Sequence, residues 1–350
     1  MLMLSSALRV RGQRVATSGH LLAAARLPSA YPARYLSSAP KDLSPYQKLQ
    51  KWLQPFVTGS KGLYHENKQA WALRRRVNEA SGRADLSRRE MLLLRQAHRD
   101  LLKSLPILAI FCVPVLGYAA PLLGYQFPKQ LLPWQFWRPD QKTQFFREDV
   151  LTRAKTYPEL AQLLLQKLAQ LLLQIEHKDD TLQEMMALAK AAGGGGLRPT
   201  QVAELAPFFE GPAALHALSS KHIHVLAEGS ALFPSFAVLN KLLMQSQLEK
   251  RLERRMEELS VDDQQLLKEG VDDLSLSELE FACQERGIVT QYGDIEKLRA
   301  ALKEWLSMYD TDHFDPETNP QRLPPSLLLH APALSSFAKP EDGDEVDPTV

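Results

Sequence analysis

The segment Leu105–Phe127, LPILAIFCVPVLGYAAPLLGYQF, decides how this chain is organised. No charged side chain occurs between Lys103 and Lys129. A continuous helix over residues 104–128 would be about 38 Å long at ~1.5 Å per residue, which exceeds the roughly 30 Å hydrocarbon core of a membrane. The run also lacks the polar face of a water-facing helix. The pattern therefore predicts one transmembrane helix over 104–128, with a buried hairpin in a soluble protein as the alternative.

Four prolines divide this apolar run: Pro106, Pro114, Pro121 and Pro128. On a helix the last three fall within roughly 40° of one another, so their kinks would gather along one side. In a membrane, neighbouring groups can satisfy the carbonyls that each proline frees. We therefore expect a bent span, or one that is split into a re-entrant pair.

Residues 1–40 have the composition of a targeting segment. They contain five arginines and no acidic residue, and they are rich in Ser, Ala and Leu. Arginines at positions 9, 11 and 14 interrupt the place where a secretory signal needs its apolar core. The segment is therefore predicted to be a mitochondrial presequence, cleaved near Leu36 and Ser37. A disordered basic tail is the alternative.

The charge changes sign along the chain. Residues 41–103 hold 14 basic and 6 acidic residues, whereas residues 201–350 hold 13 basic and 27 acidic residues. We interpret 41–103 as a basic helical segment that precedes the membrane. Its cluster Arg74, Arg75 and Arg76 could contact anionic lipid headgroups, or it could form a solvated helix face. Basic residues on the two sides of the span are too evenly divided to set its orientation.

The rest of the chain predicts an all-α fold, because helical periodicity recurs and the alternation typical of strands is absent. We expect a C-terminal helical bundle over 129–338, followed by an acidic disordered tail over 339–350. Before the span, Ser87 and Glu90 form a capping box.

Residues 276–308 predict a helix–turn–helix pair with distinct end signals. Ser277 is expected to cap the first helix, with Glu280 three residues later. Gly287 would end this helix, and Asp294 would cap the second one. The pair has no basic recognition helix of the kind that reads DNA.

No residue pattern points to catalysis or to a metal. Histidines at 216, 222 and 224 lack cysteine or acidic partners at metal-ligand spacing. A calcium loop that starts at Asp310 would need glycine where Asp315 stands and a bidentate glutamate where Gln321 stands. We therefore expect a non-enzymatic protein without cofactor or metal.

The C-terminal region has one dense basic patch: Lys250, Arg251, Arg254 and Arg255. Because glutamates alternate with these residues, a salt-bridged helix face is favoured, and contact with a partner is the alternative. The net charge of −14 over 201–350 argues against binding to DNA or other nucleic acid.

Several motifs together resemble the LETM-domain family (leucine-zipper/EF-hand-containing transmembrane proteins) over roughly residues 60–335. They are FPKQLLP at 127–133, ACQERG at 282–287, Trp305-Leu306 and PSLLL at 325–329. The stretch FWRPDQKTQF at 136–145 is most similar to the shorter branch, which lacks the EF-hand and the terminal coiled coil.

The resemblance implies a protein of the mitochondrial inner membrane with its C-terminal domain in the matrix. In the family this domain has a 14-3-3-like helical arrangement and is described as ribosome-binding. Family members are tied to potassium/proton exchange, mitochondrial volume and respiratory-chain biogenesis. An acidic domain suits basic ribosomal proteins better than ribosomal RNA.

Two hypotheses follow. In the first, a single-span inner-membrane protein binds mitochondrial ribosomes or assembly factors. In the second, spans associate as a homo-oligomer and form a potassium/proton or calcium/proton exchanger. The run between Lys103 and Lys129 lacks the ionisable side chains that usually line ion paths, which favours the first hypothesis.

Overall fold

The computed structural model describes residues 44–79, 86–113, 119–174, 196–232, 243–310 and 323–335. The chain divides into two units, Met1–Leu49 and Gln50–Val350. The predicted presequence with Leu36 and Ser37, and the acidic tail over 339–350, lie outside the described residues.

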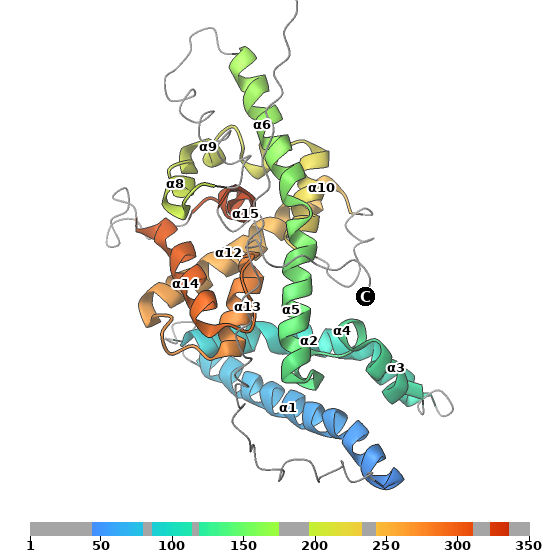
Figure 1. The fold of residues 1–350 in the computed structure, drawn as a ribbon. Coiled ribbons are helices and arrows are strands. Elements are labelled where there is room, and N and C mark those ends of the chain that lie inside the picture. The colour runs from blue at the N-terminus through green and yellow to red at the C-terminus, as the bar shows by residue number, and fades with distance from the viewer. Residues whose placement is uncertain are drawn as a thin grey trace, which may run out of the picture. The chain divides into compact units, whose positions relative to one another are not determined.

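The N-terminal part of the fold consists of helices that precede, contain and follow the apolar run (Figure 1). They are α1 (Pro45–Glu79), α2 (Arg88–Cys112), α3 (Ala120–Gln126), α4 (Pro128–Leu131), the 3-10 turn η2 (Trp134–Phe136) and α5 (Pro139–Ala154).

The C-terminal part is also helical. It contains α6 (Tyr157–Gln174), α8 (Pro199–Ala203), α9 (Ala206–Glu210), η3 (Leu215–Ala217), α10 (Ser220–Gly229), α12 (Gln245–Glu269), α13 (Leu276–Arg286), α14 (Ile295–Leu306), η4 (Ser307–Tyr309) and α15 (Pro325–Leu334). Among the described residues the only β-type pairing is a single parallel bridge between Leu197 and Ser335. The all-α prediction is therefore confirmed, while the 14-3-3-like arrangement stays a prediction.

The apolar run is not one helix. α2 includes Pro106 and ends at Cys112, and the extended backbone of Val113 follows it. Pro121 lies in the first turn of α3 and Pro128 starts α4, because a proline in the first turn loses no intrahelical hydrogen bond. The prediction of one helix over 104–128 is therefore wrong, while the expected division of the run at its prolines is observed at Pro121 and Pro128. Pro114 lies outside the described residues.

Over the described ranges, no helix combines the length and the apolar character that a crossing of the bilayer requires.

One predicted helix start is displaced. α13 is capped by Ser275, whose backbone N–H donates to the Glu278 carboxylate over 2.9 Å. The sequence offers two overlapping Ser-x-x-Glu pairs, and the prediction chose Ser277 with Glu280 instead. Glu280 is buried, so it is not available for a solvent-facing cap.

The other predicted helix ends are confirmed. Ser87 and Glu90 form the capping box of α2. Gly287 ends α13 at φ 75°, a left-handed conformation that suits glycine. Asp294 accepts hydrogen bonds from two backbone N–H groups at the start of α14.

The main core forms around α12. Its apolar side chains recur every three or four residues, which places them on one face: Leu248, Leu252, Met256, Leu259 and Leu266. The carboxylate of Asp263 lies in the same stripe and is fully buried. A second, smaller core joins Ile107, Ala120 and Leu132, so the split apolar run packs partly on itself.

Candidate functional site

A buried ion-pair network connects α2 to the C-terminal helices. Arg88, near the start of α2, donates from Nε to Asp262 Oδ1 of α12 over 2.7 Å. Asp262 also accepts from Arg286 of α13, Nη2 to Oδ2, over 2.8 Å. Burial alone would raise the pKa of Asp262, but the two guanidinium groups hold it below its usual value. One carboxylate thus joins α2, α12 and α13.

Arg286 is the centre of this network, and its side chain is 0% exposed. It donates to Asp263 from Nε over 2.8 Å and to the Ala282 carbonyl from Nη1 over 2.8 Å. Burial would lower the pKa of Arg286, but the two aspartates raise it. Asp263 has a raised pKa because it is fully buried. Its second oxygen accepts from Tyr309 Oη over 2.8 Å.

A second set of ion pairs lies further along α2, about two turns or more after Arg88. Arg95 is 3.8 Å from Glu258 and 3.6 Å from Glu285, and Arg255 is 3.2 Å from Glu285. Although burial would raise the pKa of Glu285, Arg255 and Arg95 lower it to about 2. Arg99 is 2.6 Å from Glu258. Guanidinium groups from α2 and α12 therefore neutralise these acids.

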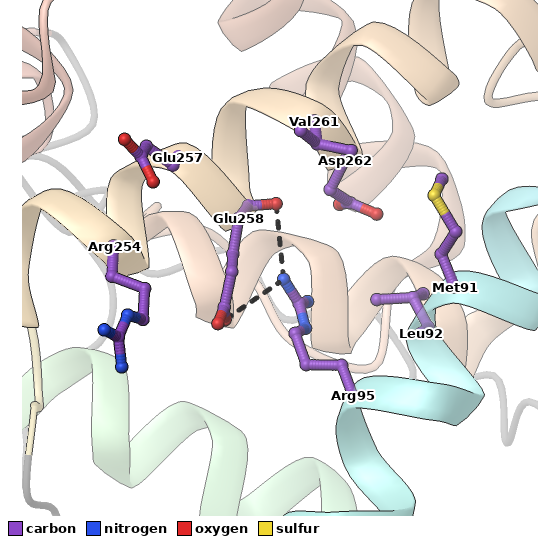
Figure 2. Close-up of a pocket in the computed structure, with 8 residues that line it drawn as sticks. All are labelled: Met91, Leu92, Arg95, Arg254, Glu257, Glu258, Val261 and Asp262. Carbon is purple, nitrogen blue, oxygen red and sulfur yellow. Dashed lines mark hydrogen bonds and ion pairs between the residues drawn. The ribbon is translucent and has the colours of Figure 1, made fainter. Parts of the chain in front are cut away.

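The same junction contains a cavity of about 340 Å³, shown in Figure 2. Met91, Leu92 and Arg95 reach it from α2, and α12 supplies Arg254, Glu257, Glu258, Val261 and Asp262. Figure 2 shows Arg95 directed at Glu258, with two contacts between them. Two of the acids that line the cavity, Glu258 and Asp262, are bound to arginines of α2 and α13, so these contacts hold the helices together rather than leave the carboxylates free for a ligand.

A different arrangement occurs where α1 meets α2 and η2. The Gln135 side-chain amide donates to Glu66 Oε2 and to Asp100 Oδ2, each over 2.6 Å. Trp134 Nε1 also donates to Asp100, over 3.0 Å. Burial raises the pKa of both carboxyl groups. Two acids that bind protons more readily than usual therefore lie beside the start of the apolar run.

The three arginines of the predicted lipid-contact cluster have different surroundings in the structure. Arg75 pairs with Glu79 over 2.9 Å, and Arg76 pairs with Glu90 over 2.6 Å. Arg74 has no ion pair with any described residue and lines a groove between α1 and α2.

The predicted partner-contact patch on α12 is not one surface. Arg255 is partly buried and bound to Glu285. Arg254 lines the cavity at α2, and Lys250 and Arg251 are exposed. The expected salt bridges therefore exist for Arg255, but its partner is on α13 rather than on α12.

The three histidines examined for metal binding do not gather. His216 is exposed and His224 is partly buried, whereas His222 bonds to His330, Nε2 to Nε2, over 2.8 Å. His330 Nδ1 faces the Ser326 carbonyl at 2.7 Å. That nitrogen must carry the proton, so His330 Nε2 accepts from His222. In the described part of the chain, no three His, Cys, Asp or Glu side chains are placed to hold a metal.

The Arg88–Asp262–Arg286–Asp263 network was not predicted from the sequence. A signal was present at Asp263, because a carboxylate inside an apolar helical stripe requires a buried cationic partner. The sequence did not show which of the many arginines would supply it.

The chain that carries this site is similar to proteins of one family. The family model described as "LETM1-like, RBD" matches residues 86–334. LETM1 domain-containing protein 1 of Xenopus tropicalis is 30% identical over 258 residues, which are 72% of this chain and 70% of that protein. The chain belongs to the LETM1-like family.

Two further relatives of this chain carry the word mitochondrial in their names. The mitochondrial proton/calcium exchanger protein of Drosophila melanogaster is 28% identical over 250 residues, or 70% of this chain. The mitochondrial LETM1 domain-containing protein YLH47 of Saccharomyces cerevisiae is 26% identical over 296 residues, or 84% of this chain. The chain spans 22% of the fly protein and 60% of the yeast protein.

The LETM1-like match begins two residues before Arg88 and ends at the last residue of α15. It therefore includes the whole ion-pair network and the split apolar run. α1 lies before the matched region.

Proposed function

We propose that this protein is a non-enzymatic protein of the mitochondrial inner membrane whose C-terminal helical domain binds basic ribosomal proteins or assembly factors in the matrix. The mitochondrial relatives support the compartment. The net charge of −14 over residues 201–350 supports a basic partner. Through such binding the protein would support respiratory-chain biogenesis and cation and volume homeostasis.

The observation that carries the membrane part of this proposal is the exposure of large apolar side chains on α2, α3 and the residue between α3 and α4. They are Leu105, Leu108, Phe111, Leu122, Tyr125 and Phe127. Soluble proteins rarely leave so many neighbouring apolar groups in water. We propose that these elements enter the bilayer together as a bent anchor, which a homo-oligomer would surround more completely than a single chain.

α2 gives the proposal its mechanism. Its C-terminal half presents the exposed apolar side chains, while its N-terminal half forms the buried ion pairs of Arg88 and Arg95. Because one helix serves both roles, the anchor and the acidic domain would move as one body. A partner would then be held at a fixed position near the membrane.

Protease protection of a C-terminally tagged chain tests this topology. We expect the tag to be protected in intact mitochondria and in mitoplasts, and affinity purification to recover ribosomal proteins or assembly factors. Digestion in mitoplasts would place the domain in the intermembrane space. Digestion in intact mitochondria would place it outside the organelle. Either result would end the ribosome proposal.

The two cysteines give an independent test of the anchor. Cys112 is exposed at the end of α2, whereas Cys283 is buried in the core. A membrane-impermeant maleimide should label Cys112 in detergent and leave it unlabelled in membranes. Cys283 should stay unlabelled in both and so reports that the protein is folded. Equal labelling of Cys112 in membranes and in detergent would contradict the anchor.

A second candidate function is ion exchange, which the proton-binding pair Glu66 and Asp100 favours. The fly relative's name includes proton/calcium exchange. Two carboxyl groups whose pKa values are raised by burial could couple proton movement to a cation. Flux measurements in liposomes that contain the purified full chain test this function. Flux that Asp100→Asn abolishes would support it, and absence of flux in the native protein would refute it.

A further inference from the structure

A groove of about 490 Å³ lies between α1 and α2, and none of the network residues described above lines it. On α1 its lining runs from Ser60 to Arg74, which is about 21 Å along a helix. The Arg76–Glu90 ion pair joins the end of α1 to the start of α2. The two helices are therefore antiparallel along the groove, with Arg74 at the closed end of the hairpin.

The walls of this groove are apolar and aromatic. Trp71 is 75% exposed and Tyr64 is 68% exposed on α1, and Leu101 and Leu108 are exposed on α2. Tryptophan and tyrosine with this exposure are typical of the region where a bilayer meets water. Ile107 lies at the buried base. The groove is thus open to an apolar ligand along its length.

Positive charge is concentrated at one end. Arg74 supplies this charge and has no ion pair with any described residue, and His98 of α2 lines the same groove. None of the side chains that line the groove is acidic. Between Lys61 and Arg76, α1 has five Lys or Arg residues and one acidic residue. An apolar groove with a cationic end is complementary to a ligand that has a hydrocarbon chain and an anionic head.

We propose that this groove binds one acyl chain of an anionic phospholipid from the bilayer, with the lipid phosphate at Arg74 beside His98. One leaflet supplies about half of the roughly 30 Å hydrocarbon thickness, so a groove of about 21 Å accommodates an acyl chain and its head group. The inference deepens the membrane attachment proposed above and rests on it. It also assigns a role to α1, which precedes the family match.

The structure supplies a matched pair of variants for the test. Arg74→Glu removes the cation that lines the groove. Arg75→Glu makes the same change in charge one residue away, at a side chain that is exposed, outside the groove and paired only with Glu79. Diffuse attraction to an anionic surface responds equally to both variants, whereas a phosphate site at Arg74 responds to one.

The full chain in neutral detergent micelles is titrated with phosphatidylglycerol that carries a fluorescent acyl chain. We expect saturable binding of one lipid per chain, about tenfold weaker in Arg74→Glu and unchanged in Arg75→Glu, as the loss of one charge-assisted contact predicts. Phosphatidylcholine with the same acyl label should not saturate. A photoactivatable acyl chain should cross-link to α2 near Leu101 and Leu108.

Several outcomes would overturn the proposal. Equal weakening by the two variants would mean diffuse charge attraction only. Chain-to-chain cross-links at Trp71, with no lipid cross-link, would assign the groove to a second copy of the protein. Alkaline extraction of the native chain from membranes separates the two proposals. A chain that resists extraction but binds no lipid in micelles refutes the groove site alone, and release of the native chain refutes the membrane anchor.

Discussion

Replacing Arg286 with methionine should destabilise the protein more than most single changes. The side chain is completely buried and forms three hydrogen bonds to two carboxylates and one to a carbonyl. Its loss leaves Asp263 buried with only the neutral donors Trp305 and Tyr309. Removal of one partner from a buried pair typically costs about 3–5 kcal/mol of unfolding free energy. At about 2–4 °C per kcal/mol, the melting temperature should fall by about 10 °C.

Urea unfolding of the full chain, followed by far-ultraviolet circular dichroism, measures this loss. Arg255→Met is the matched control, because its partner Glu285 keeps a second cation in Arg95. We expect the control to lose less than half as much. Adding Asp263→Asn to Arg286→Met should recover part of the loss, since no buried charge is then left unpaired. A cost below about 1 kcal/mol for Arg286→Met would refute the view that this network stabilises the fold.

Three further predictions concern pH, backbone conformation and reactivity. Burial, together with the nearby His330 and Lys167, lowers the pKa of His222 to about 3. Burial lowers the pKa of His330 to about 4. Because unfolded histidines bind protons below about pH 6.5, stability should fall from there towards pH 4, by about 1.4 kcal/mol per pH unit for each histidine. Thermal melts of His222→Gln should show a shallower fall. Gly287→Ala should destabilise more than Gly293→Ala in urea titrations, because both glycines have positive φ but an added Cβ at Gly287 would meet buried side-chain atoms 2.5 Å and 2.7 Å away. Burial raises the pKa of the Cys283 thiol to about 12, so iodoacetamide should modify it only after unfolding, and rapid modification of native protein would contradict the core position.

Local signals predicted local structure well. Ser87 and Asp294 begin helices and Gly287 ends one, as expected, because capping depends on hydrogen bonds within a few residues. The two Ser-x-x-Glu pairs at the start of α13 show the limit of such signals. Either serine could cap the helix, and the choice of Ser275 follows from the burial of Glu280, which only the folded core decides.

The apolar run shows a different limit. Hydropathy measures the apolar character of side chains and ignores backbone geometry, so it predicted one helix over 104–128. Pro121 and Pro128 instead begin new helices, and the packing of Ile107 against Ala120 and Leu132 gives the pieces a shared core. Those contacts join residues that no periodic pattern relates. The sequence therefore identified the segment, its apolar character and the prolines that could divide it, but not the contacts between its pieces.

Three-dimensional structure also separates Arg74, Arg75 and Arg76, which the sequence groups together. Adjacent arginines look equivalent in sequence, yet helical geometry points them about 100° apart. Two of them reach glutamates, and one reaches the groove. A cluster in sequence is therefore not a cluster in space, and Arg74 alone remains for a ligand.

The motif that reveals the family has a structural explanation. In ACQERG at 282–287, Cys283 is buried and Glu285 and Arg286 form ion pairs, while the Gly287 carbonyl accepts from Tyr157 Oη over 2.7 Å. Substitutions in this motif should therefore lower the stability of the fold, and any loss of function that they cause would follow from unfolding. Side chains that bind a partner must instead be accessible, as Arg74 and Trp71 are. Because the buried network joins α2 to α12 and α13, binding at the α1–α2 groove or at the apolar run would fix the orientation of the acidic domain without any change inside it.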